Sequence, residues 1–125
     1  MYGSAGMGVI LIKPVWGAYM SERRYSDEVV YVDPDFEDLI PSFLENREAD
    51  ISSIRQSLVS SDMSEIRRLG HCMKGAGAGY GFPEVTRLGS VIEEAAKRGD
   101  AQSIEEAVQM LAEYLSAVEI RVESE

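Results

Sequence analysis

The feature that most constrains the fold is a run of apolar residues near the C-terminus with strict helical spacing. The steps alternate between four and three residues, and the positions are Ile104, Val108, Leu111, Leu115, Val118 and Val122. This spacing puts the side chains on one face of a helix, which is typical of the seam of an antiparallel bundle. The sequence therefore predicts a helix over this whole run that packs against other helices.

A first amphipathic segment follows Asp33 and Pro34. Proline suits a first helical turn and disfavours helix in the residue before it, so we expect the first helix to start near this point. Pro41 would cost about 3 kcal/mol in a helix interior and is milder in the first turns, so we expect the helix to begin no earlier than about residue 35. The segment reads as one arm of a hairpin or as two short helices, and its apolar positions are Phe36, Leu39, Ile40, Phe43, Leu44, Ile51, Ile54 and Leu58.

Two more amphipathic segments, at about residues 63 to 79 and 83 to 99, lie between these. Asp62 and Glu65 resemble a capping box, in which each side chain satisfies a backbone donor at the helix start. Pro83 suits the first turn of the later segment and Gly99 its end, and Asp100 can cap the last helix.

Short connections between successive amphipathic helices imply antiparallel neighbours. We therefore predict an all-α fold, an antiparallel up-down-up-down four-helix bundle preceded by a short N-terminal helix or extended arm. The bundle is expected over residues 30 to 122, with an N-terminal extension over residues 1 to 29 and a tail over residues 123 to 125. Val29–Val32 is β-prone, and residues 1 to 19 share no helical period with the rest. The polar stretch that begins at Met20 resembles the N-terminus of an ordinary protein. Met20 is therefore either the natural first residue, preceded by an added or misassigned segment, or an internal methionine.

Composition narrows the class of partner. The 125 residues include 12 basic and 22 acidic side chains, a formal net charge of -10. Nucleic acids and anionic membrane surfaces repel such a chain, so we expect neither as a partner, and docking onto another soluble protein fits better. A single cysteine, no signal peptide and no apolar stretch near the roughly 20 residues of a membrane helix predict a soluble, cytoplasmic protein, expected to be a monomer.

His71 is the only histidine, which makes a conventional zinc or iron site improbable. At about 100° per residue from Ile66, the core stripe of this helix falls on Leu69, Gly70, Met73, Gly77 and Tyr80. His71 lies about 140° away and is predicted to point to solvent. A lone helical histidine is more often a packed core residue, and this geometry contradicts that reading.

The surroundings of His71 are unusual for a helix. Gly70, Gly75, Gly77 and Gly79 each cost about 1 kcal/mol relative to Ala. Gly70 and Gly77 face the core, where they allow close helix approach, and Gly79 lies at the helix end. Gly75 is predicted to be exposed one turn from His71, where its effect is to leave the imidazole unobstructed.

Other residues near His71 are suited to an anion attached to its imidazole ring. Lys74 can extend its ammonium toward such an anion, and Ala78 keeps the surface flat. Residues 64 to 99 carry six basic and four acidic side chains, a local charge of +2 that includes Arg67 and Arg68. A cationic face on an acidic body suits a partner with an acidic pocket, although a solvated surface explains the charge equally well.

The stretch from His71 to Phe82, HCMKGAGAGYGF, resembles the signature of histidine-containing phosphotransfer (HPt) domains. In that signature the phosphorylated histidine is followed by Lys at +3, Gly at +4 and Gly at +10, which are Lys74, Gly75 and Gly81 here. The similarity covers about residues 30 to 118 and includes Glu84, Leu88, Glu93, Ala95, Gly99 and Asp100. Met73 departs from the usual Leu, with its volume preserved.

The resemblance implies a phosphocarrier without its own ATP-dependent kinase activity, in a bacterial two-component phosphorelay. His71 would accept the phosphoryl group, Lys74 would steady its charge, Gly75 would give access and Gly81 would permit the turn. Arg67, Arg68, Ala78 and Gly81 are expected to contact the partner. The partners would be receiver domains and a hybrid sensor kinase, and no cofactor is expected because the receiver supplies Mg²⁺.

Two other readings stay open. The bundle could be an interaction module that docks signalling proteins without phosphorylation, with His71 incidental. It could also be a hydrolase or phosphatase with His71 as base. The second reading lacks an orienting acid three or four residues from His71, where Arg67, Arg68, Lys74 and Gly75 lie instead.

Overall fold

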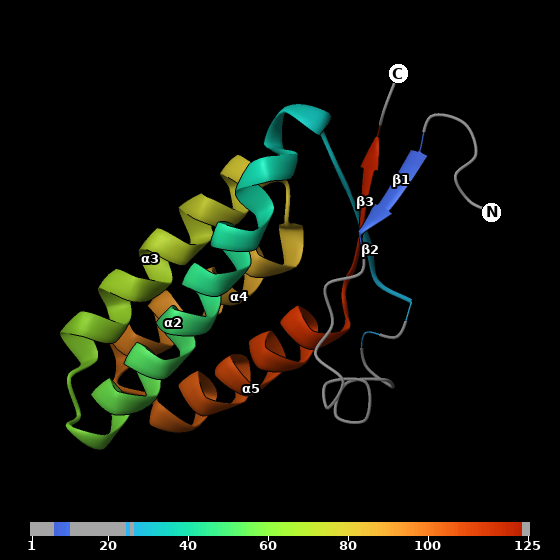
Figure 1. Ribbon diagram of the computed structural model, residues 1–125. Helices are drawn as coiled ribbons and strands as arrows, with labels where there is room; N and C mark the ends of the chain where they lie inside the picture. The colour runs from blue at the N-terminus through green and yellow to red at the C-terminus, as the bar shows by residue number, and fades with distance from the viewer. Residues whose placement is uncertain (1–6, 11–24, 26, 124–125) are drawn as a thin grey trace. The chain divides into compact units, whose positions relative to one another are not determined.

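A computed structural model describes residues 7–10, 25 and 27–123 of the chain. Met20 and most of residues 1 to 19 lie outside the described residues, so the prediction about the natural start stays a prediction. Within the described part, the α-helices are α2 (Ile40–Val59), α3 (Met63–Tyr80), α4 (Pro83–Arg98) and α5 (Ala101–Ala117) (Figure 1). The other elements are a 3-10 helix η1 (Pro34–Leu39) and the strands β1 (Met7–Ile10), β2 (Val29–Val32) and β3 (Glu119–Glu123). The predicted four-helix bundle is confirmed, and the small sheet is an addition to it.

The chain divides into two compact units. Residues 45–112 form one, here called the bundle unit, and residues 1–44 with 113–125 form the other, here called the sheet unit. Helices α2 and α5 contribute residues to both units.

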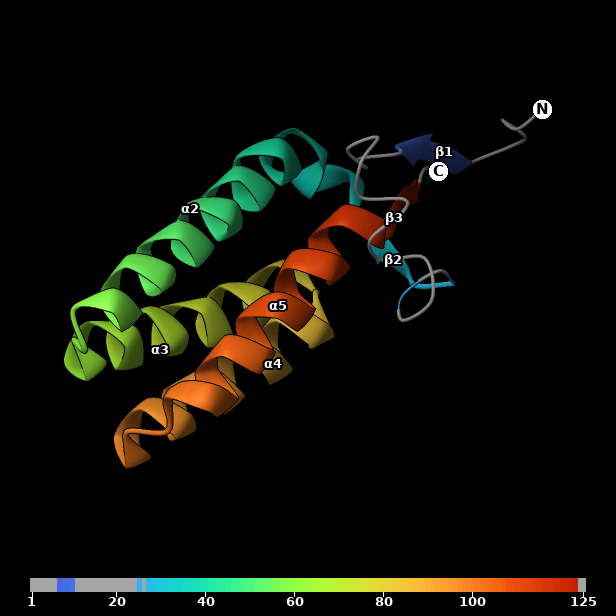
Figure 2. The same ribbon diagram turned by 90° about the horizontal axis from the view of Figure 1, so that it is seen from below.

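The bundle unit contains α3, α4 and most of α2 and α5, which lie side by side as antiparallel neighbours in both views (Figures 1 and 2). Its largest buried side chains come from every helix and are Ile54, Ile66, Met73, Phe82, Leu88, Ile92, Ile104 and Leu111. Gly70 and Gly77 lie where α3 meets the backbone of α4, as predicted, because a Cβ at either glycine would lie within 3.0 Å of α4 or of the turn before it.

Most predicted helix ends are confirmed. Gly99 ends α4 with a left-handed φ of 68°, and Asp100 accepts hydrogen bonds from the backbone N–H and the hydroxyl of Ser103 at the start of α5. The capping box is half correct. Asp62 accepts from the Glu65 N–H at 3.1 Å, but the Glu65 carboxylate pairs with Arg68, and the Asp62 N–H donates to the Ser57 carbonyl instead.

Of the two readings of the first amphipathic segment, the single hairpin arm is confirmed from Ile40 on, and the two short helices are not. The chain forms η1 from Pro34 and then one uninterrupted helix of 20 residues, α2, with Pro41 as its second residue. Phe36 and Leu39 were predicted to face the core, but they lie in η1 and remain 37% and 47% exposed. A 3-10 helix has about 3.0 residues per turn instead of about 3.6, and this different repeat takes them off the stripe that α2 continues.

The sheet unit holds a three-stranded sheet in the order β1-β3-β2. Strand β1 runs antiparallel to β3, with Ile10 opposite Ile120, and β2 runs parallel to it, with Val32 opposite Val122. Val30, Val32, Ile120 and Val122 are buried, and the ring of Tyr25 meets that of Tyr114 edge-on at 5.2 Å.

The prediction that the last helix reaches Val122 is wrong. Helix α5 ends at Ala117, and β3 begins at Glu119. Val118, Ile120 and Val122 are buried and alternate with more exposed polar residues, which is the period of a strand. Positions 118 and 122 satisfy a helical step of four as well as two strand steps, so the apolar pattern alone did not separate the two. No described helix combines the length and apolar character needed to cross a membrane.

Candidate functional site

His71 lies on the exposed side of α3. Its side chain is 67% exposed, whereas the buried residues of this helix are Ile66, Leu69, Gly70, Met73 and Gly77. The predicted core stripe is confirmed at these positions, and Tyr80 is half-buried. The prediction that His71 points to solvent is therefore confirmed.

The His71 ring is held by a carboxylate from the neighbouring helix. Glu93 of α4 places Oε2 at 3.1 Å from Nδ1 of His71 and Oε1 at 2.9 Å from Nζ of Lys74. Glu93 is only 7% exposed, and both its oxygens are engaged by residues of α3. The three side chains form one cluster, here called the His71 cluster.

The cluster determines which ring nitrogen can react. The Lys74 hydrogen bond, with a smaller contribution from the His71 hydrogen bond, holds the pKa of Glu93 below its ordinary value although burial works in the other direction. Glu93 is therefore an ionised acceptor near neutral pH, and Nδ1 of His71 must carry the proton in their hydrogen bond. A neutral imidazole then has its lone pair on Nε2, the other nitrogen of the exposed ring.

Sequence reasoning missed the contact that orients His71. It looked for an acid within one turn on the same helix and found none, but the acid lies 22 residues away on α4. The signal was available, because Glu93 stands next to Ile92 and among the buried apolar positions of α4. Buried glutamates are rare unless they are paired, so an acid at a core position predicts a partner.

The glycines beyond His71 have different environments. A Cβ added at Gly75 would meet nothing within 4 Å, so packing gives no reason for this exposed glycine, as predicted. Gly79 is equally open, and Ala78 is exposed beside it. Gly81 ends α3 with a φ of 82°, a left-handed conformation that favours glycine and turns the chain toward α4.

Comparison with known proteins agrees with this geometry. Residues 38–120 match the family described as Hpt domain, a match that covers α2 to α5. The chain belongs to the Hpt domain family. No curated protein and no solved structure matches it significantly. Hpt domains are phosphocarriers of two-component signalling that lack kinase activity and interact with receiver domains and kinases.

The two predicted docking arginines of this Hpt domain differ. Arg68 forms a bidentate pair with Glu65 one turn earlier on α3, and that carboxylate raises the pKa of Arg68 further above its ordinary value. Arg67 is exposed, and the described part of the chain places no carboxylate at ion-pair distance from it. The positive charge of Arg67 is thus less neutralised by the described residues than that of Arg68.

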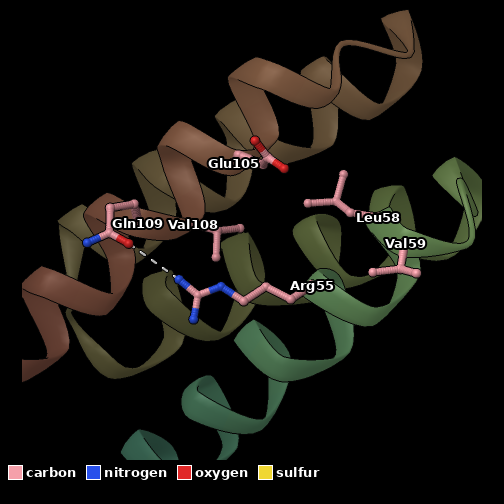
Figure 3. A pocket seen from close by; sticks show the side chains of 6 residues that line it. All are labelled: Arg55, Leu58, Val59, Glu105, Val108 and Gln109. Carbon is pink, nitrogen blue, oxygen red and sulfur yellow. Dashed lines mark hydrogen bonds between the residues drawn. The ribbon is translucent and has the colours of Figure 1, made fainter.

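A cavity of about 440 Å³ in the bundle unit lies away from the His71 cluster. Its lining comes from α2 and α5 and consists of Arg55, Leu58, Val59, Glu105, Val108 and Gln109 (Figure 3). The Arg55 guanidinium donates to Oε1 of Gln109 at 3.4 Å across it. None of the residues predicted to take part in phosphotransfer lines this cavity. Among the described residues, no group of histidine, cysteine and acidic side chains is arranged to hold a metal ion.

Proposed function

We propose that this Hpt domain accepts a phosphoryl group on Nε2 of His71 from the phosphoaspartate of a receiver domain and passes it on to a receiver aspartate. The observation that carries the proposal is the His71 cluster. It combines a largely exposed imidazole with a buried carboxylate that holds the proton on Nδ1. A nucleophile that must meet another protein's active site needs both exposure and a defined reactive atom.

The transfer balances without a further reagent. The Nε2 lone pair forms the N–P bond as the P–O bond to the aspartate breaks, and the aspartate leaves as a carboxylate. The ring keeps its Nδ1 proton and becomes positively charged, so the Glu93 carboxylate at 3.1 Å stabilises the phosphorylated form. The reverse transfer to another aspartate starts from the same oriented ring.

Lys74 supplies positive charge near the transferred group. Its Nζ is bound to Glu93 at 2.9 Å while the side chain remains 39% exposed, so the ammonium lies beside the ring with freedom to turn toward the phosphoryl oxygens. The Mg²⁺ that phosphoryl transfer requires belongs to the receiver in this proposal.

The proposal includes the setting of the reaction. The partners are receiver domains and a hybrid sensor kinase of a bacterial phosphorelay, and the domain acts as a cytoplasmic monomer. Arg67, Arg68, Ala78 and Gly81 lie on or next to the His71 side of α3 and are proposed to contact the receiver, with Gly75 leaving the space for its approach.

The direct test is His71→Gln. Incubated with a phosphorylated receiver and Mg²⁺, the unmodified protein should gain an acid-labile phosphoryl group, and the variant should gain none. Because the side chain is largely exposed, circular dichroism should stay unchanged, and the melting temperature should fall only by the small amount expected for one lost hydrogen bond to Glu93. Persistent labelling of the variant would overturn the assignment of His71.

The same experiment distinguishes phosphotransfer from the alternative function, an interaction module that docks without phosphorylation. A docking platform without phosphorylation predicts that the unmodified protein binds the receiver but gains no label, and that His71→Gln binds equally well. Phosphoryl transfer that depends on His71 excludes that reading.

A further inference from the structure

We infer that Gly70 and Gly89 are positioning residues for phosphotransfer, because they set the α3–α4 spacing at which Glu93 reaches both His71 and Lys74. The inference rests on the proposed function and extends it to two residues that touch neither the imidazole nor the partner. It concerns what holds the proton on Nδ1 of His71 and so leaves Nε2 as the reactive nitrogen.

The two glycines contact the backbone of the residues that make the cluster. A Cβ at Gly89 would lie 2.6 Å from the backbone nitrogen of Lys74 and 3.0 Å from its Cα. A Cβ at Gly70 would lie 2.8 Å from the backbone nitrogen of Glu93 and 3.1 Å from its Cα. Gly89 of α4 thus lies against the backbone of Lys74, and Gly70 of α3 lies against the backbone of Glu93.

The atoms in the way belong to the backbone, so no side chain can rotate aside. Contacts below 3.0 Å are essentially never made by a real Cβ, and ordinary contact begins at 3.4 Å. A methyl group at Gly89 must therefore push α4 away from α3 by several tenths of an ångström or more. Packed helices move as rigid pieces, and the displacement reaches Glu93 one turn further along α4.

Glu93 has little reach to spare. Its two oxygens already span from α4 to two different residues of α3, at 3.1 Å and 2.9 Å. Hydrogen bonds weaken steeply once the donor and acceptor are further than about 3.5 Å apart. Separating the helices would free Nδ1 of His71, and the ring would return to the mixture of tautomers of a free histidine, in which the proton lies mainly on Nε2.

The experiment compares the imidazole nitrogens of Gly89→Ala with those of the unmodified protein by long-range ¹H–¹⁵N NMR, well below the melting temperature. The unmodified protein should show a single Nδ1–H tautomer, and Gly89→Ala should lose it. The rate of transfer from a phosphorylated receiver should fall on the order of tenfold, as for one charge-assisted hydrogen bond lost.

Two controls separate positioning from stability. Gly79→Ala adds the same methyl group to α3 in open space and should keep both the tautomer and the transfer rate. Ile104→Ala removes a fully buried side chain of α5, so it should lower the melting temperature and still keep the tautomer. A folded Gly89→Ala protein with the unmodified spectrum would overturn the inference, and so would loss of the tautomer in Ile104→Ala.

If Gly89→Ala does not fold, Glu93→Asp tests whether the carboxylate has reach to spare at the present spacing of α3 and α4. It shortens the carboxylate's reach by one methylene, about 1.5 Å, and leaves the helices in place. The inference expects the tautomer to be lost, and an unchanged spectrum contradicts it. The spectra are recorded on unphosphorylated protein. If they change as expected but no protein accepts a phosphoryl group, the proposed function fails, and the glycines keep only their role in orienting the His71 ring.

Discussion

At the scale of single residues, the His71 ring is oriented by a carboxylate of a different helix, on which the proposed reactivity of His71 depends. Glu93 joins His71 and Lys74 through one oxygen each, and its buried position excludes the water that would compete for them. The chemistry therefore depends on three side chains that act as a unit.

Glu93→Gln should change how stability depends on pH. The pKa of Glu93 is lowered in the folded protein, so its ionised form contributes stability that is fully present above the ordinary pKa of about 4.5 and is lost as the pH falls through the folded value. The variant should be less stable than the unmodified protein at pH 7, and the difference should shrink toward pH 3, as measured by urea unfolding.

Glu94→Gln is the control for this titration, because Glu94 is 55% exposed and forms a surface pair with Lys97. The free energy of unfolding of Glu94→Gln should differ little from that of the unmodified protein at every pH between pH 7 and pH 3. A difference for Glu93→Gln that stays constant between pH 7 and pH 3 would contradict the role of the ionised carboxylate.

Lys74→Ala should shorten the lifetime of the phosphohistidine or slow transfer, because the ammonium next to the ring is lost, while the fold persists. Lys97→Ala is a close match, since Lys97 is 38% exposed against 39% for Lys74, and it also pairs with a glutamate of α4. The measurement is the rate at which the phosphohistidine decays in each of the two variants. Equal decay would remove Lys74 from the mechanism.

At the scale of elements, α3 carries glycines for two opposite reasons. Gly70 and Gly77 face α4, where added atoms would collide, whereas Gly75 and Gly79 face open space. The first pair serves packing, whereas no contact accounts for Gly75, and the proposed function assigns it to the access of a receiver to His71.

Gly75→Gln should raise helix stability by up to about 1 kcal/mol, because an exposed mid-helix glycine is replaced by a better helix former. Transfer should nevertheless fall sharply, since the long side chain lies one turn from His71, where the receiver approaches. The melting temperature and the transfer rate are measured on the same protein. Gly79→Gln, two turns from His71 in equally open space, should retain transfer. A Gly75→Gln protein that is more stable and fully active would refute the clearance argument.

At the scale of the whole molecule, the charge is unevenly distributed along the chain. The net charge is -10, but residues 64 to 99 have more basic than acidic side chains. The segment that contains His71 is thus less acidic than the chain as a whole, which under the proposed function weakens its repulsion from an acidic receiver pocket.

Arg67→Ala should slow association with a phosphorylated receiver more than Arg68→Ala does. Arg68 is already neutralised by Glu65, whereas Arg67 has no such pair among the described residues. Stopped-flow association rates at low and high salt provide the test, because screening should shrink the effect of an exposed charge. Equal effects of the two variants, or an Arg67 effect that does not depend on salt, would exclude electrostatic steering by Arg67.

Local sequence patterns were sufficient to predict the four helices of the bundle, apart from the end of α5, and the direction of His71. Amphipathic periods, prolines and capping residues are local signals, and the angle from Ile66 to His71 depends only on the helical repeat. The exposed Gly75 followed from the same geometry. Each of these properties is contained within one helix.

The partner of His71 and the end of α5 depend instead on contacts between elements that lie far apart in the sequence. Glu93 lies 22 residues away, and its reach depends on how closely α3 and α4 pack at their glycines, which no single-helix pattern contains. Val118 and Val122 fit a helix and a strand alike. Residues Glu119–Glu123 pair with β1 and β2, which lie far away in the sequence, and this pairing selected the strand, because a strand is stabilised by hydrogen bonds to its neighbours rather than within itself.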